Sequence, residues 1–115
     1  AGAARMFEAI QKAPHFLAGR ARFDTALLRA RPGRFLVKCG AEGCFGIGVR
    51  PPLGPLGIAV KIDDGTPRGY ETFLARFLVK LGLLEGSEAS LATFLAGKVH
   101  NTRGHEVGEI RTAMD

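Results

Sequence analysis

The sequence is poor in the residues that mark several common protein classes. It contains no tryptophan, one tyrosine and only two cysteines among 115 residues. Two cysteines are too few for a disulfide-stapled scaffold, which carries several bridges. No apolar run approaches the ~20 residues that span a bilayer, so we expect no contact with a membrane. The first residues lack the order of a signal peptide, and we expect a cytoplasmic protein.

The composition is typical of a small globular domain with a basic surface. Apolar residues make up 46% of the chain, which is too many for a disordered protein. A chain of 115 residues has the length of one domain, so we expect residues 1–115 to form a single unit. The formal net charge of +5 raises the question of a nucleic-acid partner.

Five arginines gather in one short segment of the sequence. They are Arg20, Arg22, Arg29, Arg31 and Arg34. Such a cluster could contact phosphates, but apolar residues are interleaved with the arginines and no nucleic-acid-binding motif accompanies them. We therefore expect the solvated basic face of a helix and no nucleic-acid partner.

Apolar spacing and turn residues divide the chain into helices and strands. The patterns predict helices over residues 2–12, 25–30 and 67–82 and after residue 87, and strands over residues 34–39, 43–50, 56–62 and 107–110. Asp24, Thr66 and Ser87 are the expected N-caps of the second, third and fourth helices. Gly82 is expected to end the third helix.

The predicted strands have one bulky face and one bare face. Large apolar residues occupy alternate positions, namely Phe35, Val37, Phe45, Ile47, Val49, Ile58, Val60 and Ile62. This alternation predicts an α+β fold, in which helices pack on the apolar face of an antiparallel sheet of three to four strands. The opposite face carries glycines together with Lys38 and Lys61. Because glycine weakens a strand interior, we expect a ligand to approach the backbone there.

The two cysteines, Cys39 and Cys44, flank Gly-Ala-Glu-Gly. A lone Cys-x4-Cys pair is a poor zinc signal, because a structural site needs four ligands. An extended strand separates residues five apart too widely for a disulfide, so we expect two free thiols. Cys39 is a poor candidate nucleophile, because its neighbour Lys38 should point to the opposite face of the strand.

Several blocks of the sequence resemble the C-terminal part of the bacterial L-asparaginase II family, which is typified by the rhizobial enzymes. The blocks are Gly33-Arg-Phe-Leu-Val-Lys-Cys-Gly-Ala-Glu-Gly43, Leu56-Gly-Ile-Ala-Val-Lys-Ile-Asp-Asp-Gly65, Gly19-Arg-Ala-Arg-Phe-Asp-Thr25, Asn101-Thr-Arg-Gly104 and Val107-Gly-Glu-Ile-Arg111. Together they span nearly all of the chain, which is about a third of the family's usual length. The resemblance implies hydrolysis of L-asparagine to L-aspartate and ammonia, and a fold like that of serine β-lactamases and glutaminases, with helices on both sides of the sheet.

In that fold group a Ser-x-x-Lys pair supplies the nucleophile and its activating amine, and a Lys-[Ser/Thr]-Gly strand lines the substrate pocket. By resemblance, Lys38-Cys39-Gly40 is the pocket-edge strand. The residues expected to bind substrate are Lys38, Gly40, Glu42, Gly43 and Lys61. Two of these have alternatives: Glu42 could bind the substrate ammonium or fix a turn, and Lys61 could line the pocket or be a surface lysine.

The departures from the family pattern concern the chemical machinery. The only serines are Ser87 and Ser90, and neither is followed by lysine three residues later. The family's zinc-ligating segments are also missing, so we expect no cofactor in this chain. The chain should therefore contribute the substrate-pocket strand of an amidohydrolase, be inactive alone and need an N-terminal portion. We also expect it to form homo-oligomers; the alternative is a non-catalytic ligand-binding or dimerisation module.

Overall fold

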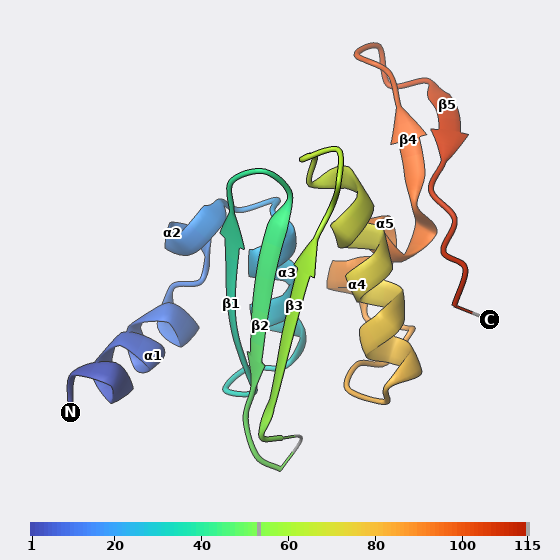
Figure 1. Cartoon of the computed structure of the whole chain (residues 1–115). Helices are drawn as coiled ribbons and strands as arrows, with labels where there is room; N and C mark the ends of the chain where they lie inside the picture. The colour runs from blue at the N-terminus through green and yellow to red at the C-terminus, as the bar shows by residue number, and fades with distance from the viewer. Residues whose placement is uncertain (53, 115) are drawn as a thin grey trace.

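The computed structural model describes residues 1–52 and 54–114 of the chain (Figure 1). The helices are α1 (Gly2–Lys12), α2 (His15–Ala18), α3 (Phe23–Ala30), α4 (Arg68–Lys80) and α5 (Ala92–Ala96), which continues the short 3-10 helix η1 (Ala89–Leu91). The strands are β1 (Phe35–Gly40), β2 (Cys44–Val49), β3 (Leu56–Lys61), β4 (Lys98–His100) and β5 (Glu106–Glu109). No helix in the described ranges is long and apolar enough to cross a bilayer.

The three central strands form an antiparallel sheet in the order β1-β2-β3. Its register aligns Lys38 with Gly46 and Gly46 with Ala59 across the three strands. The predicted α+β class and the antiparallel sheet are therefore confirmed. The strand predicted near residues 107–110 does not join this sheet but pairs with β4 in a separate hairpin, which projects away from the sheet (Figure 1).

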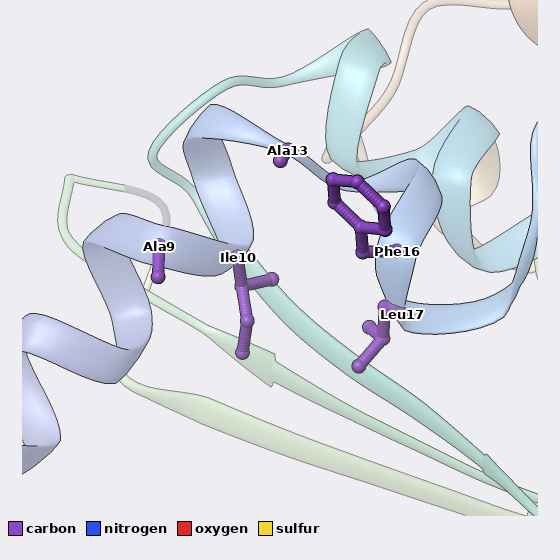
Figure 2. A pocket seen from close by; sticks show the side chains of 5 residues that line it. All are labelled: Ala9, Ile10, Ala13, Phe16 and Leu17. Atoms are coloured by element: carbon purple, nitrogen blue, oxygen red, sulfur yellow. The ribbon is translucent and has the colours of Figure 1, made fainter.

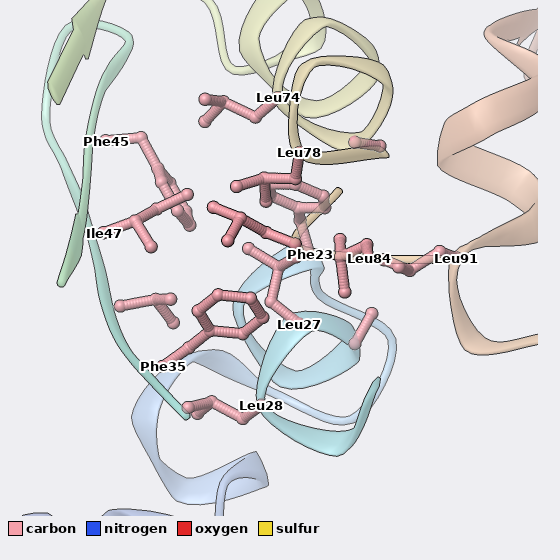
Figure 3. Packing of buried hydrophobic residues seen from close by; sticks show 14 of the residues in the cluster. Phe23, Leu27, Leu28, Phe35, Phe45, Ile47, Leu74, Leu78, Leu84 and Leu91 are labelled. Atoms are coloured by element: carbon pink, nitrogen blue, oxygen red, sulfur yellow. The ribbon is translucent and has the colours of Figure 1, made fainter. Parts of the chain in front are cut away.

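The core lies between one face of the sheet and helices α3 and α4 (Figure 3). The sheet contributes Phe35, Val37, Phe45, Ile47 and Val49, all of which are buried as the alternation predicted. Aromatic rings extend this contact, since the Phe45 ring lies 5.4 Å from the Phe23 ring and 4.9 Å from the Tyr70 ring, measured between centroids. Helix packing on this face leaves the opposite face of the sheet to carry the small and charged side chains.

Side chains from the N-terminal helices cover the free edge of β1. The Gln11 side chain donates to the Phe35 carbonyl over 2.8 Å and accepts the Gly33 N–H, also over 2.8 Å. Nearer the other end of the strand, the Cys39 N–H donates to Asp24 Oδ2 over 3.1 Å. Unpaired backbone groups on an edge strand invite pairing with another chain, and these contacts remove some of them.

The three predicted helix caps are wrong, although the helices form. Asp24 lies inside the first turn of α3, which begins at Phe23, and its carboxylate bonds to β1 instead of to its own helix. Thr66 bonds back to Asp64, whose Oδ1 accepts both the N–H and the hydroxyl of Thr66 over 2.8 Å, and these bonds lower the pKa of Asp64. Ser87 precedes Glu88, the N-cap of η1, and caps nothing.

The predicted end of α4 at Gly82 is confirmed. Gly82 has φ +75°, and the Leu83 N–H bonds back to the Leu78 carbonyl over 2.9 Å, as expected where a chain leaves a helix through a left-handed residue. Of the hairpin that follows α5, the sequence predicts only β5, because β4 has three residues and lacks an apolar alternation. Arg76 holds this part of the chain to α4 through bonds to the carbonyls of Leu95 and Ala96.

The importance of the sheet–helix core can be measured on α4. Leu74 is 0% exposed in the core, whereas Leu81 at the end of the same helix is 46% exposed. Leu74→Ala should lower the free energy of unfolding by about 2–5 kcal/mol, because it removes buried methyl groups and leaves a cavity. Leu81→Ala should change it by less than about 0.5 kcal/mol. Equal losses for the two variants in urea unfolding would contradict this packing.

Candidate functional site

The open face of the sheet carries a shallow hollow of about 560 Å³. It crosses all three strands and is lined by Lys38, Cys39, Gly40, Cys44, Phe45, Gly46, Ala59, Val60 and Lys61. Of the residues predicted to bind substrate, the structure brings Lys38, Gly40 and Lys61 to this hollow and places Glu42 and Gly43 in the turn beside it. Their role in binding remains a prediction.

The floor of the hollow carries two glycines, Gly40 and Gly46, which we call the bare strip. A Cβ added at Gly46 would meet its nearest atom, the Lys38 carbonyl oxygen, at 4.0 Å, whereas one added at Gly40 would lie 3.2 Å from Cys44 Cβ. Neither residue has a positive φ, so neither glycine is needed for the backbone conformation. Because glycine costs stability in a strand, Gly46 is better explained by access to the backbone than by packing.

Lys38 is exposed at the outer edge of the sheet, and its ammonium bends back along its own strand. The Nζ atom donates to the Cys39 carbonyl over 2.8 Å and lies 3.5 Å from Cys39 Sγ. The expectation that strand alternation would keep Lys38 away from Cys39 is therefore wrong. The long lysine side chain reaches around an edge strand, where no neighbouring strand blocks it.

Lys61 is exposed too, but its ammonium is engaged by the backbone. The Nζ atom donates to the Glu42 carbonyl over 2.5 Å and to the Ile62 carbonyl over 2.6 Å. These bonds hold the turn between β1 and β2 against the end of β3. Lys61 thus has a structural role in this conformation, while the aliphatic part of its side chain borders the hollow.

Glu42 and Gly43 form the tight turn that joins β1 to β2. Both have positive φ, +64° and +69°. Gly43 is also closely packed, because a Cβ there would lie 3.0 Å from the Gly65 carbonyl carbon and 3.0 Å from the Thr66 oxygen. The Ile62 N–H donates to the Gly43 carbonyl over 3.0 Å, so the β1–β2 turn is bonded to the residues that follow β3. Of the two readings of Glu42, this geometry favours the turn.

Asp24 is a site residue that sequence reasoning missed. It is 0% exposed, and its Oδ2 accepts the N–H of Cys39, the middle residue of Lys38-Cys39-Gly40. Its Oδ1 has no hydrogen-bond partner among the described residues. Burial of a carboxylate is unfavourable unless the carboxylate is hydrogen-bonded. The bond from the Cys39 N–H therefore offsets part of the cost of burying Asp24. The signal in the sequence was a charged residue within the apolar stretch Phe23–Leu28.

The residues of the hollow do not fit a zinc site. Strand alternation places Cys39 on the helix-covered face with Phe45 and Cys44 on the open face with Gly40, and both thiols are free. Within residues 1–52 and 54–114, no three His, Cys, Asp or Glu side chains gather as metal ligands would. We therefore derive no catalytic step through a metal in this part of the chain.

The β1–β2 turn can be tested with two glycines of similar φ. Gly43→Ala should lower the free energy of unfolding by at least about 2 kcal/mol, because positive φ and close backbone atoms both oppose a Cβ. Gly33→Ala, at φ +76° with nothing within 4 Å of the added Cβ, should cost only about 1 kcal/mol. Chemical denaturation of both variants measures the difference, and a Gly43 variant no less stable than the Gly33 variant would contradict the close approach.

Comparison with known protein families identifies the family of the chain. The family model described as L-asparaginase II matches residues 1–112. No curated protein sequence matches the chain. The match covers β1 and β3, which carry the two lysines, and the turn that joins β1 to β2. The match confirms the resemblance over almost the whole length of the chain. The chain belongs to the L-asparaginase II family.

Proposed function

We propose that this chain provides the substrate-pocket strand of an asparaginase-type amidohydrolase that converts L-asparagine to L-aspartate and ammonia. The observation that carries the proposal is the bare strip on the sheet, where Gly40 and Gly46 lie beside the exposed ammonium of Lys38. The strip allows a small polar substrate to lie against the backbone. The family to which the chain belongs supports an amide such as asparagine as that substrate.

In this proposal Lys38 provides the positive charge of the pocket. Its ammonium exchanges the Cys39 carbonyl for a substrate carboxylate, or for the oxyanion that forms during amide hydrolysis. Asp24 acts indirectly, since its bond to the Cys39 N–H fixes the strand from which Lys38 extends. Gly40 keeps the adjacent surface free of side chains. These residues bind and orient substrate but supply no nucleophile.

The nucleophile of the reaction is proposed to come from polypeptide outside residues 1–115. Amide hydrolysis by covalent catalysis requires a nucleophile beside a base. Ser90 is directed toward the Ala26 carbonyl and lines a different hollow, and Ser87 is exposed in the loop after α4. Cofactors, zinc included, are likewise proposed to belong outside this chain. We assign the complete enzyme to the cytoplasm, in agreement with two free thiols.

Binding of L-asparagine to this chain tests the role of Lys38. Titration followed by amide NMR should shift resonances of β1 and β2. Lys38→Ala should weaken binding about tenfold to a hundredfold, because a charge-assisted hydrogen bond to the substrate is lost. Lys12→Ala, which removes an exposed lysine at the end of α1, is the matched control and should bind as the unchanged chain does. Unaltered affinity of the Lys38 variant would refute its role.

Ammonia release provides the second arm of this test. The chain alone should release no ammonia from L-asparagine. Turnover by the chain alone, abolished by Lys38→Ala, would show that the nucleophile lies within residues 1–115 and would overturn that part of the proposal.

One observation favours a dimerisation module as the second candidate function. Helices α1 and α2 surround an apolar hollow of about 330 Å³, lined by Ala9, Ile10, Ala13, Phe16 and Leu17 (Figure 2). Phe16, which lines this hollow, is 84% exposed. Large exposed apolar side chains grouped on one surface are typical of protein interfaces. A second copy of the chain is the partner we propose.

Sedimentation equilibrium tests the dimer. The chain should associate at micromolar to millimolar concentration, and Phe16→Ser should shift it toward monomer because the most exposed aromatic side chain of the surface is lost. Leu36→Ser, an exposed apolar residue on β1, is the control and should leave association unchanged. A monomeric chain at the highest concentration would exclude this alternative.

A further inference from the structure

A polar hollow that shares no lining residue with the hollow beside Lys38 lies next to α4. It has a volume of about 420 Å³ and is bordered by the start of α4, by α5 and by β4. We call it the α4–β4 hollow and define it by Arg22, Arg68, Glu71, Thr93, Phe94 and His100, which are among the residues that line it. Nothing in the proposed asparaginase chemistry uses these side chains.

Glu71 is the unusual member of this hollow. It is half-buried, and within the described ranges it has neither a hydrogen bond through its side chain nor an ion pair within 4 Å. Burial raises the pKa of Glu71, Arg22 lowers it, and Asp24 raises it further. A carboxylate removed from water without a donor is unfavourable. The hollow therefore offers an acceptor that still lacks a strong donor.

The cations of the hollow are arranged beside this carboxylate. Arg22 and Arg68 are exposed and form no ion pair in the described part of the chain. Lys98 also lines the hollow, but its ammonium is occupied by Glu106 at 2.8 Å and Glu109 at 3.6 Å. Two guanidiniums and one carboxylate without an ion pair in the described part of the chain thus line the same hollow.

The walls of the hollow are held in place by contacts outside it. Gly97 has φ +67°, and a Cβ there would lie 2.7 Å from the Ile110 oxygen and 3.0 Å from Thr72 Cγ2. The Ile110 N–H donates to the Gly97 carbonyl over 2.7 Å. Arg76 Nε adds a 3.0 Å bond to the Leu95 carbonyl. These contacts join the hairpin and α5 to α4, so the backbone on these sides of the hollow is held in place.

We propose that the α4–β4 hollow binds a free α-amino acid at a site separate from the asparaginase pocket. The ligand carboxylate is held by the Arg22 and Arg68 guanidiniums, whose planar donors match a carboxylate in pairs. The ligand ammonium donates to Glu71, and the Thr93 hydroxyl and Phe94 ring border the ligand side chain. A ligand with only one of the two charges would leave either the arginines or Glu71 without a partner. The inference is independent of the proposed function.

Three probes with the same carbon skeleton test this site. L-alanine carries both charges, propionate only the carboxylate and propylamine only the ammonium. The protein is the full chain with Lys38→Ala, which removes the main cation of the first pocket. In amide NMR titrations, L-alanine should shift resonances of α4, α5 and β4. Propionate and propylamine should each bind at least about tenfold more weakly, because each loses one charge-assisted contact.

Variants assign the two ends of the ligand. Glu71→Gln should weaken L-alanine about tenfold or more and leave propionate unchanged or tighter, because the amide removes the repulsion of a carboxylate. Arg68→Gln, at an exposed position at the start of α4, should weaken both. Glu8→Gln on α1 is the matched control and should change neither. Spectra of the unliganded variants report whether the fold is kept.

The pH dependence supplies an independent readout. Binding of the ammonium requires ionised Glu71, and burial holds the pKa of Glu71 above its usual 4.5. Affinity should therefore fall as the pH is lowered, and the fall should begin at a higher pH than for an ordinary carboxylate. The charged groups around Glu71 are Arg22 just before α3, Asp24 in α3, Arg68 from its own helix, and Lys98 and His100 from β4. His100→Gln is included as a control for the imidazole that lines the hollow.

Several outcomes would overturn the proposal. Equal affinity for propionate and L-alanine would identify a simple anion site. Unchanged affinity of Glu71→Gln would remove the carboxylate from recognition. Resonance shifts confined to β1 and β2, or no shifts with any probe, would show that the hollow does not bind amino acids. None of these results bears on binding of L-asparagine beside Lys38, which is measured separately in the chain with Lys38 intact.

Discussion

The burial of one face of a three-stranded sheet under α3 and α4 is the constraint on which the rest of the structure depends. It fixes the register of β1, because a shift by one residue would turn Phe35 and Val37 outward and bring Lys38 into an apolar core. The same contact decides that Gly46 lies on the open face. The hollow therefore follows from packing, since the small and charged side chains that the helices do not cover lie on this face.

Hydrophobic periodicity was sufficient to predict the strands that build this face and the helices with buried stripes, within about two residues at their ends. The predictions that are wrong or missing concern residues whose partners are distant in sequence. Asp24 has the chemistry of a helix cap but bonds to Cys39, 15 residues away. Strand β4 has three residues and is held by pairing with β5 and by Gly97, neither of which an apolar pattern reports. Tertiary contacts override local preference at these positions.

The candidate site was predictable in part for the same reason. Alternation along β1 and β3 correctly assigned Lys38 and Lys61 to the open face. It could not show where their ammonium groups would go, because a lysine side chain is long enough to leave the direction set by its Cα. The structure attaches Lys38 to the edge of β1 and Lys61 to the neighbouring turn. The two lysines occupy the same position in the strand alternation, but they differ in how readily each ammonium can meet a ligand.

Helix α1 shows how unevenly the chain is held together. It has no buried residue, and it is held to the rest of the chain by the half-buried Ile10, by the two hydrogen bonds of Gln11 to Gly33 and Phe35, and by the Arg50 guanidinium, which lies 4.1 Å from the centroid of the Phe7 ring. An element attached by so few contacts opens at a lower free energy than the core does. Loosening of α1 would therefore uncover the Phe35 carbonyl, which the Gln11 side chain covers at the edge of β1.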